Sequence, residues 1–261
     1  MSTILHTQIM GEGPPLVILH GLFGSWENWG SQAKRLAEHF TVYLMDARNH
    51  GQSPHHEAMD YDHMAADVIA TMGEHAVEQA AFIGHSMGGK TAMQVALTSP
   101  ERVSRLVVVD IAPKAYAPHH EGIFEGLFAL NLAQLSRRSD VDTQLKSHVD
   151  DPNIRAFLLK NLRREGTGFG WKMHLEAIHR NYAHIIGGIT GDMPYSGPTL
   201  FIKGATSDYL QTSDRAGIAA LFPQVTAKTI DGAGHWPHSE KGAVFYKIAD
   251  DFLRAESQAA P

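Results

Sequence analysis

The stretch Ala80–Leu97, AAFIGHSMGGKTAMQVAL, places Ser86 between a short apolar run and a run of helical composition. Glycines surround this serine at Gly84, Gly88 and Gly89. The pattern Gly-x-Ser-x-Gly is typical of a serine on a sharp turn from a strand into a helix, where its hydroxyl is exposed. Such a turn strains the backbone and crowds the residues two before and two after the serine, so that a Cβ there would clash. The stretch therefore predicts a nucleophilic serine at the end of a strand.

Apolar runs alternate with helical patterns on both sides of this stretch. Continuous apolar strands separated by helices are typical of a parallel sheet covered on both faces. We predict an α/β fold with a mostly parallel sheet, to which residues Thr3–Met10 add an antiparallel edge strand. The expected strands are Pro15–Gly21, Phe40–Asp46, Ala80–Ser86, Arg105–Pro113, Pro198–Gly204 and Thr226–His235. The expected helices of this part are Trp29–Glu38, Tyr61–His75, Gly89–Thr98 and Ala243–Arg254.

The alternation stops between residues 113 and 197, where we expect helices and no strand. Apolar residues recur at helical spacing from Ile123 to Leu130, and Asn153–Arg164 and Trp171–Ile186 show similar patterns. These helices either extend the core or form a cap. We predict a helical cap at residues 113–197, inserted between two strands of a core domain made of residues 1–112 and 198–261.

The composition restricts the classes of function. The chain has 261 residues, a formal net charge of −6 and no cysteine. No basic patch stands out, so nucleic acid is not an expected partner, and disulfides and thiolate chemistry are excluded. No signal peptide and no membrane-spanning run is evident, which predicts a cytoplasmic protein. The oligomeric state stays open.

Histidine is abundant, with 17 residues, which raises the question of a metal site. The doublets His55–His56 and His119–His120 stand in polar stretches, and no spacing typical of metal ligands is present. We therefore expect these doublets on the surface, and no metal and no cofactor.

A serine hydroxyl becomes a good nucleophile only when a base removes its proton. His235 stands in the loop DGAGHW, after an apolar strand and before the last helix, and is the expected base. An oxyanion hole requires two backbone N–H groups directed at the developing negative charge. We expect one from Met87, directly after the serine, and the other from Leu22, which follows the glycine that ends the strand Pro15–Gly21.

Two aspartates qualify as the carboxylate that orients His235. The chain order in such sites is serine, acid, histidine, and Asp110, at the end of RLVVVD, and Asp208, after PTLFIKGATS, both satisfy it. A carboxylate at the end of a buried strand needs hydrogen-bond donors, and a histidine Nδ1–H is one. The residues alone leave the choice between these two aspartates open.

The chain resembles the α/β-hydrolase superfamily and, more narrowly, the ybfF-type acyl-esterases and their abhydrolase-domain relatives. The resemblance rests on the segments VILHGLFGSWENW, DARNHGQS, FIGHSMGGK, VVVDIAP and DGAGHWPHSEK, and is thinner in the cap. The superfamily's usual acid ends a GxxD loop, which here ends in Ser207, with Asp208 displaced by one residue. The resemblance to ybfF-type enzymes implies that the acid is Asp110, in VVVDIAP.

These residues predict a serine hydrolase that cleaves carboxylic esters or thioesters of small to medium acyl substrates through an acyl-enzyme. The same groups also serve carbon–carbon bond hydrolysis or perhydrolysis, and a ligand receptor without activity is a third hypothesis. Haloalkane dehalogenases and epoxide hydrolases of this fold carry an aspartate in place of Ser86, which argues against those activities. The side chains expected to contact substrate are Phe23, His85, Phe124, Phe128, Trp171 and Trp236.

Overall fold

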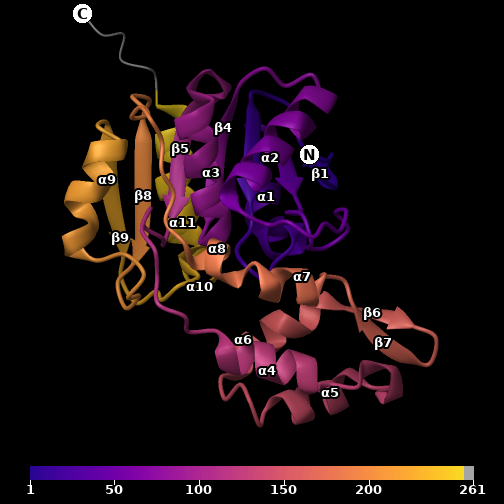
Figure 1. The fold of residues 1–261 in the computed structure, drawn as a ribbon. Coiled ribbons are helices and arrows are strands. Elements are labelled where there is room, and N and C mark those ends of the chain that lie inside the picture. The colour runs from indigo at the N-terminus through magenta and orange to yellow at the C-terminus, as the bar shows by residue number, and fades with distance from the viewer. Residues whose placement is uncertain (256–261) are drawn as a thin grey trace, which may run out of the picture.

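A computed structural model describes residues 1–255, and within them a seven-stranded sheet has the strand order β1-β3-β2-β4-β5-β8-β9 (Figure 1). Every pair of neighbouring strands is parallel except β1 and β3, which are antiparallel. The predicted mostly parallel sheet and its antiparallel edge strand are thus confirmed. The strands are β1 Thr7–Met10, β2 Pro15–Leu19, β3 Thr41–Met45, β4 Ala80–His85, β5 Val103–Val109, β8 Thr199–Gly204 and β9 Val225–Ile230.

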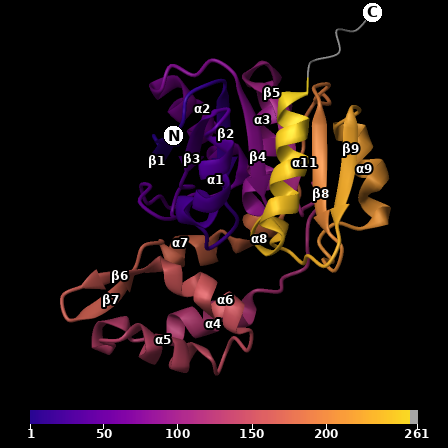
Figure 2. The ribbon, with the colours of Figure 1, turned by 180° about the vertical axis from the view of Figure 1, so that it is seen from behind.

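Helices cover both faces of this sheet (Figures 1 and 2). Along β2, Val17 and Leu19 pack into one apolar cluster with α2 and α3, whereas Leu16 and Ile18 pack into a second cluster with α1 and α11. This period of two follows from the pleat of a strand that is buried on both faces. The covering helices are α1 Gly30–Leu36, α2 Tyr61–Glu74, α3 Met87–Thr98, α9 Arg215–Leu221 and α11 Gly242–Arg254. In residues 1–255, no helix has the length and apolar character needed to span a bilayer.

The chain between β5 and β8 forms a separate group of elements beyond the end of the sheet at which β5 stops (Figures 1 and 2). Two stretches of chain, called crossings here, connect this group to the sheet, and they are hydrogen-bonded to each other. Tyr116 N–H donates to the Ile186 carbonyl at 2.9 Å, and Ile189 N–H donates to the Pro113 carbonyl at 3.1 Å. We call residues 113–116 and 186–189 the neck. The elements beyond the neck are α4 Glu121–Ala129, α5 Arg138–Leu145, α6 Pro152–Leu158, β6 Leu162–Glu165, β7 Gly168–Trp171, α7 Leu175–Arg180 and α8 Tyr182–Ile186.

The expectation of no strand in this inserted segment is wrong, because β6 and β7 form an antiparallel hairpin. Gly166 has a φ of 57°, the left-handed conformation that a tight hairpin turn needs. Leu162 and Phe169, one from each strand, pack into a small apolar cluster with Leu132, Val141 and Leu159. The helix predicted at residues 153–164 therefore ends earlier, at Leu158. Trp171 is the last residue of a strand and not, as predicted, the first residue of a helix.

Candidate active site

Ser86 stands at the junction of β4 and α3 with a φ of 52° and a ψ of −118°, a strained conformation for a residue other than glycine. A Cβ on Gly84 would overlap the carbonyl of Gly88, and a Cβ on Gly88 would overlap the carbonyl of Leu19. The two glycines are therefore needed for the turn itself. The α3 helix behind Ser86 is buried over almost its whole length, which fixes the turn rigidly.

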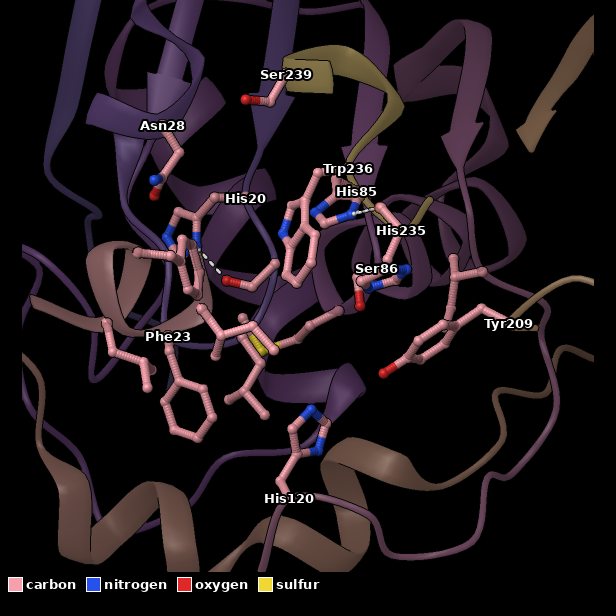
Figure 3. Close-up of a pocket in the computed structure, with 18 of the residues that line it drawn as sticks. His20, Phe23, Asn28, His85, Ser86, His120, Tyr209, His235, Trp236 and Ser239 are labelled. Carbon is pink, nitrogen blue, oxygen red and sulfur yellow. Dashed lines mark hydrogen bonds between the residues drawn. The ribbon is translucent and has the colours of Figure 1, made fainter. Parts of the chain in front are cut away.

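Asp110 and His235 form a hydrogen-bonded pair beside this turn. His235 Nδ1 lies 2.7 Å from Asp110 Oδ2, where it donates to the carboxylate. Nε2 of the ring is then left for Ser86, and both residues line the same cavity (Figure 3). Within the described residues the Ser86 hydroxyl does not hydrogen-bond to His235, and catalytic bonds of this kind commonly tighten only when substrate binds.

The Asp110 carboxylate is fully buried and its charge is held by three donors. Besides His235, the Gly204 N–H donates to Oδ1 at 3.0 Å and the Ser207 hydroxyl donates to Oδ2. Buried charges are tolerated when they are satisfied in this way. Asp208, in contrast, is exposed and accepts from Gln211 Nε2 at 3.3 Å. The structure thus brings Asp110 to His235 and leaves Asp208 outside the site.

The two expected oxyanion donors lie on either side of Ser86. Residues 21–24 form a turn in which the Gly24 N–H donates to the Gly21 carbonyl at 2.9 Å. A Cβ on Gly21 would lie 3.3 Å from that of Ser86, so the turn is directly beside the serine. Leu22 and Met87 both line the same cavity as Ser86. Met87 is the first residue of α3, where a backbone N–H has no acceptor inside the helix.

A cavity of about 850 Å³ lies between the end of the sheet and the inserted segment. Ser86 and His235 line it, as do three of the side chains expected to contact substrate, Phe23, His85 and Trp236 (Figure 3). The other three are not among its lining residues. Phe124 lies behind Phe23 with the ring centroids 5.3 Å apart, Phe128 is exposed, and Trp171 packs at the β6–β7 hairpin.

Two residues with aromatic rings that the sequence analysis did not assign to the site, Tyr209 and His120, line the cavity together with Ser86 and His235 (Figure 3). The Tyr209 ring stacks on His235, with centroids 3.8 Å apart and an interplanar angle of 19°. His120 accepts from the Tyr182 hydroxyl at Nδ1, at 2.7 Å, and burial lowers its pKa to about 3, so the ring is neutral. His120 therefore belongs to the cavity wall, and its expected place on the surface is wrong. No spacing in the sequence connects it with Ser86.

His85 supports His235 from behind. Its Nε2–H donates to the His235 carbonyl at 2.7 Å, and its ring packs between those of His235 and His238, with centroid distances of 4.7 and 4.6 Å. His238 in turn stacks on Trp29, with the rings 4.2 Å apart. Burial lowers the pKa of His85 well below its ordinary value, so the ring stays neutral and keeps its role as a donor. The described residues contain no group of three or more His, Asp or Glu side chains placed to hold a metal ion.

A parallel sheet, a strained serine turn after β4 and a histidine loop after β9 define a class of hydrolases. The chain belongs to the α/β hydrolase fold family, whose model matches residues 14–242. The family resemblance expected from the sequence motifs is thus confirmed.

Individual relatives align over nearly the whole chain. The sn-1-specific diacylglycerol lipase ABHD11 of Xenopus laevis is 40% identical over 251 residues, which cover 93% of this chain and 80% of the relative. The esterase YbfF of Escherichia coli is 36% identical over 229 residues, which cover 87% and 88%. A solved structure of a marine microorganism esterase matches with a TM-score of 0.94 and 41% identity, over 97% of this chain and 100% of that one.

Proposed function

We propose that this protein is a serine hydrolase that cleaves carboxylic esters or thioesters of small to medium acyl substrates. The observation that carries the proposal is the bond between His235 and a buried Asp110 directly beside Ser86 on its strained turn. The relatives named as esterases and as a lipase support an ester substrate. We further propose that residues 113–197 form the cap over the site.

The reaction follows from the positions of these groups. His235 Nε2 takes the Ser86 proton while Asp110 holds the ring in the required tautomer. The Ser86 oxygen attacks the acyl carbon, and the Leu22 and Met87 amides bind the oxyanion of the tetrahedral intermediate. The intermediate collapses when His235 returns the proton to the leaving alkoxide or thiolate, which gives an acyl-enzyme. A water molecule, deprotonated by the same histidine, then releases the acid and restores Ser86.

The cavity supports a substrate of limited size. Its volume of about 850 Å³ is within the range of sites that enclose ligands of drug size. Phe23, Ile111 and Phe157 give it an apolar wall on which an acyl chain can pack. Hydrolysis of carbon–carbon bonds and perhydrolysis use the same groups, and no observation in the described residues favours them over ester hydrolysis.

The proposal is tested by labelling and by turnover. An alkyl phosphonate directed at active serines is expected to add once per chain, at Ser86, as mapped by mass spectrometry of peptides. Ser86→Ala is expected to abolish labelling and to lower the turnover of para-nitrophenyl esters by at least 10³-fold. Ser147→Ala, an exposed serine in the inserted segment, is the matched control. Full activity in Ser86→Ala contradicts the proposal, and negligible turnover of every ester by the wild type favours carbon–carbon bond hydrolysis.

A further inference from the structure

The segment DARNHGQS, residues 46–53, contains a buried histidine that the proposed mechanism does not use. His50 has no exposed surface, and its Nδ1 lies 3.0 Å from the Arg48 carbonyl, to which it donates. Its Nε2 lies 3.2 Å from the backbone nitrogen of Phe23. Because a backbone N–H can only donate, Nε2 is the acceptor, and the two contacts together fix a single tautomer.

This bond requires a neutral imidazole. Burial, together with the neighbouring His20 ring at 5.3 Å, lowers the pKa of His50 to about 3. Other titratable groups of this region are bonded elsewhere: the Asp46 carboxylate accepts from the Trp26 and Gln52 amides and lies 3.0 Å from His6 Nδ1, and the Arg48 guanidinium donates to Asp67. His55 lies near enough to lower the pKa of His50 further. His50 is therefore an acceptor over the whole physiological pH range.

The residue that His50 holds is the strained position of the turn beside Ser86. The backbone of Phe23 has a φ of 59°, a value that residues other than glycine seldom adopt. Phe23 is the third residue of the turn formed by residues 21–24. The turn is fixed at three further points. His20 Nδ1 donates to the Gly21 carbonyl at 2.8 Å, Gly24 N–H to the same carbonyl, and Asn161 Nδ2 to the Phe23 carbonyl at 2.7 Å.

The Leu22 N–H forms no hydrogen bond within residues 1–255, which leaves it available to an oxyanion. If the Phe23 N–H lost its acceptor, the peptide between Leu22 and Phe23 could rotate and bring φ of Phe23 back to a negative value. That rotation would relieve the strain. It would turn the Leu22 carbonyl and the Phe23 N–H, which belong to that peptide, and would loosen the position of Leu22, whose own N–H belongs to the preceding peptide. The bond to His50 opposes it.

We propose that His50 is the positioning residue of the oxyanion hole. By accepting the Phe23 N–H it keeps the turn of residues 21–24 in its strained form, with the Leu22 N–H directed at the oxyanion on Ser86. This inference rests on the proposed function, because it assigns a role in that same reaction. It also explains why this motif contains a buried neutral histidine, 36 residues before Ser86 in the sequence.

Variants of His50 separate this role from a merely structural one. His50→Leu removes the acceptor, whereas His50→Gln places an amide oxygen near the position of Nε2. Thr71→Val is the matched control, because the Thr71 hydroxyl is equally buried and accepts a distant backbone N–H, that of Leu5 at 2.9 Å, but does not line the cavity. The measurements are kcat and KM for a short para-nitrophenyl ester, and the affinity for an alkyl boronic acid, which forms a tetrahedral anion on the serine.

We expect His50→Leu to lower kcat by 10- to 100-fold, less than the loss of an entire oxyanion donor, and to change KM by less than threefold. The affinity for the boronic acid should fall in proportion to kcat, and His50→Gln should recover at least tenfold of the loss. Thr71→Val should keep the kcat of the wild type. Wild-type kcat in His50→Leu, or a loss confined to KM, overturns the inference.

A measurement on the unaltered protein covers the case in which His50→Leu does not fold. In protein labelled with ¹⁵N at histidine and phenylalanine, an N–H···N bond gives a scalar coupling between the Phe23 amide nitrogen and His50 Nε2. Absence of this coupling overturns the inference. Failure of the proposed function is distinguishable, because it leaves Ser86→Ala active whatever the result for His50.

Discussion

Asp110 and Asp208 have very different surroundings, although both follow the carboxyl ends of parallel strands, β5 and β8, at the same end of the sheet. Asp110 is fully buried, has a φ of 52° and bonds to His235, whereas Asp208 is exposed. We expect Asp110→Asn to lower kcat for a short ester by about 10³- to 10⁴-fold, because the amide no longer selects the tautomer of His235 that can accept a proton. Asp208→Asn should change kcat by less than twofold. The opposite pattern in steady-state kinetics would make Asp208 the acid.

At the scale of residues, local geometry was predictable and cavity lining was not. The spacing of the glycines around Ser86 predicts a turn of five residues. Gly84 and Gly88 are needed there because a Cβ on either would overlap backbone atoms. The chain order of the site could be predicted in the same way, except for the choice between two aspartates. Whether Phe124 or His120 reaches the cavity depends instead on which face of the inserted segment packs inward, and a single sequence does not contain that information.

Helix α3 carries a second unusual side chain one turn after Ser86. Lys90 is buried, and its ammonium donates to the carbonyls of Lys114 at 2.8 Å and Gly187 at 2.5 Å, one on each crossing of the neck. The Tyr116 ring lies 4.8 Å from the same ammonium. Burial, together with the Lys114 charge, lowers the pKa of Lys90 to about 7. Lys90 thus connects α3, the helix that follows Ser86, with both ends of the inserted segment.

We expect Lys90→Met to loosen this connection. The unpaired carbonyls should lower the free energy of unfolding by about 2–4 kcal/mol, as measured with urea. In the proposed binding mode, a long acyl chain reaches the inserted segment and a short one does not. KM for an octanoyl ester should therefore rise by about fivefold, roughly 1 kcal/mol of binding, while kcat/KM for an acetyl ester changes by less than twofold. An equal effect on both esters would contradict this account, and the exposed Lys34→Met is the control.

At the scale of elements, the sheet was more predictable than the inserted segment. A strand buried on both faces, such as β4, appears in the sequence as one apolar run with clear ends. The strands β6 and β7 have four residues each, and β6 is mostly exposed. They are stabilised by the contact of Leu162 and Phe169 with residues from three other elements, so no local pattern predicts them.

The whole molecule contains several buried neutral histidines, and these make its stability depend on pH. Burial lowers the pKa of His50, His120 and His238 to about 3. Below the ordinary histidine pKa of about 6.5, the unfolded chain binds protons that these three rings do not bind in the fold. The free energy of unfolding should therefore be nearly constant above about pH 8 and fall increasingly steeply as the pH drops through 6.5. These three rings alone give a slope of about 4 kcal/mol per pH unit near pH 5, and His85, whose pKa burial also lowers, adds to it.

Urea titrations between pH 8 and pH 5 measure this dependence. His120→Asn should reduce the slope by about 1.4 kcal/mol per pH unit, the contribution of one such group. His184→Asn, at an exposed position, should leave the slope unchanged. A free energy of unfolding that stays constant down to pH 5 would show that the buried rings take up protons without loss of the fold.

The neck has a consequence for how this architecture can vary. Its two crossings bond to each other at 2.9 and 3.1 Å, so the chain beyond them is a closed loop whose ends are already joined. The entropy of closing a loop grows only with the logarithm of its length, about 0.6 kcal/mol for each doubling. Ser86, Asp110 and His235 all lie outside that loop. Evolution or a protein engineer can therefore exchange or resize the inserted segment while the sheet and the three proposed catalytic residues stay in place.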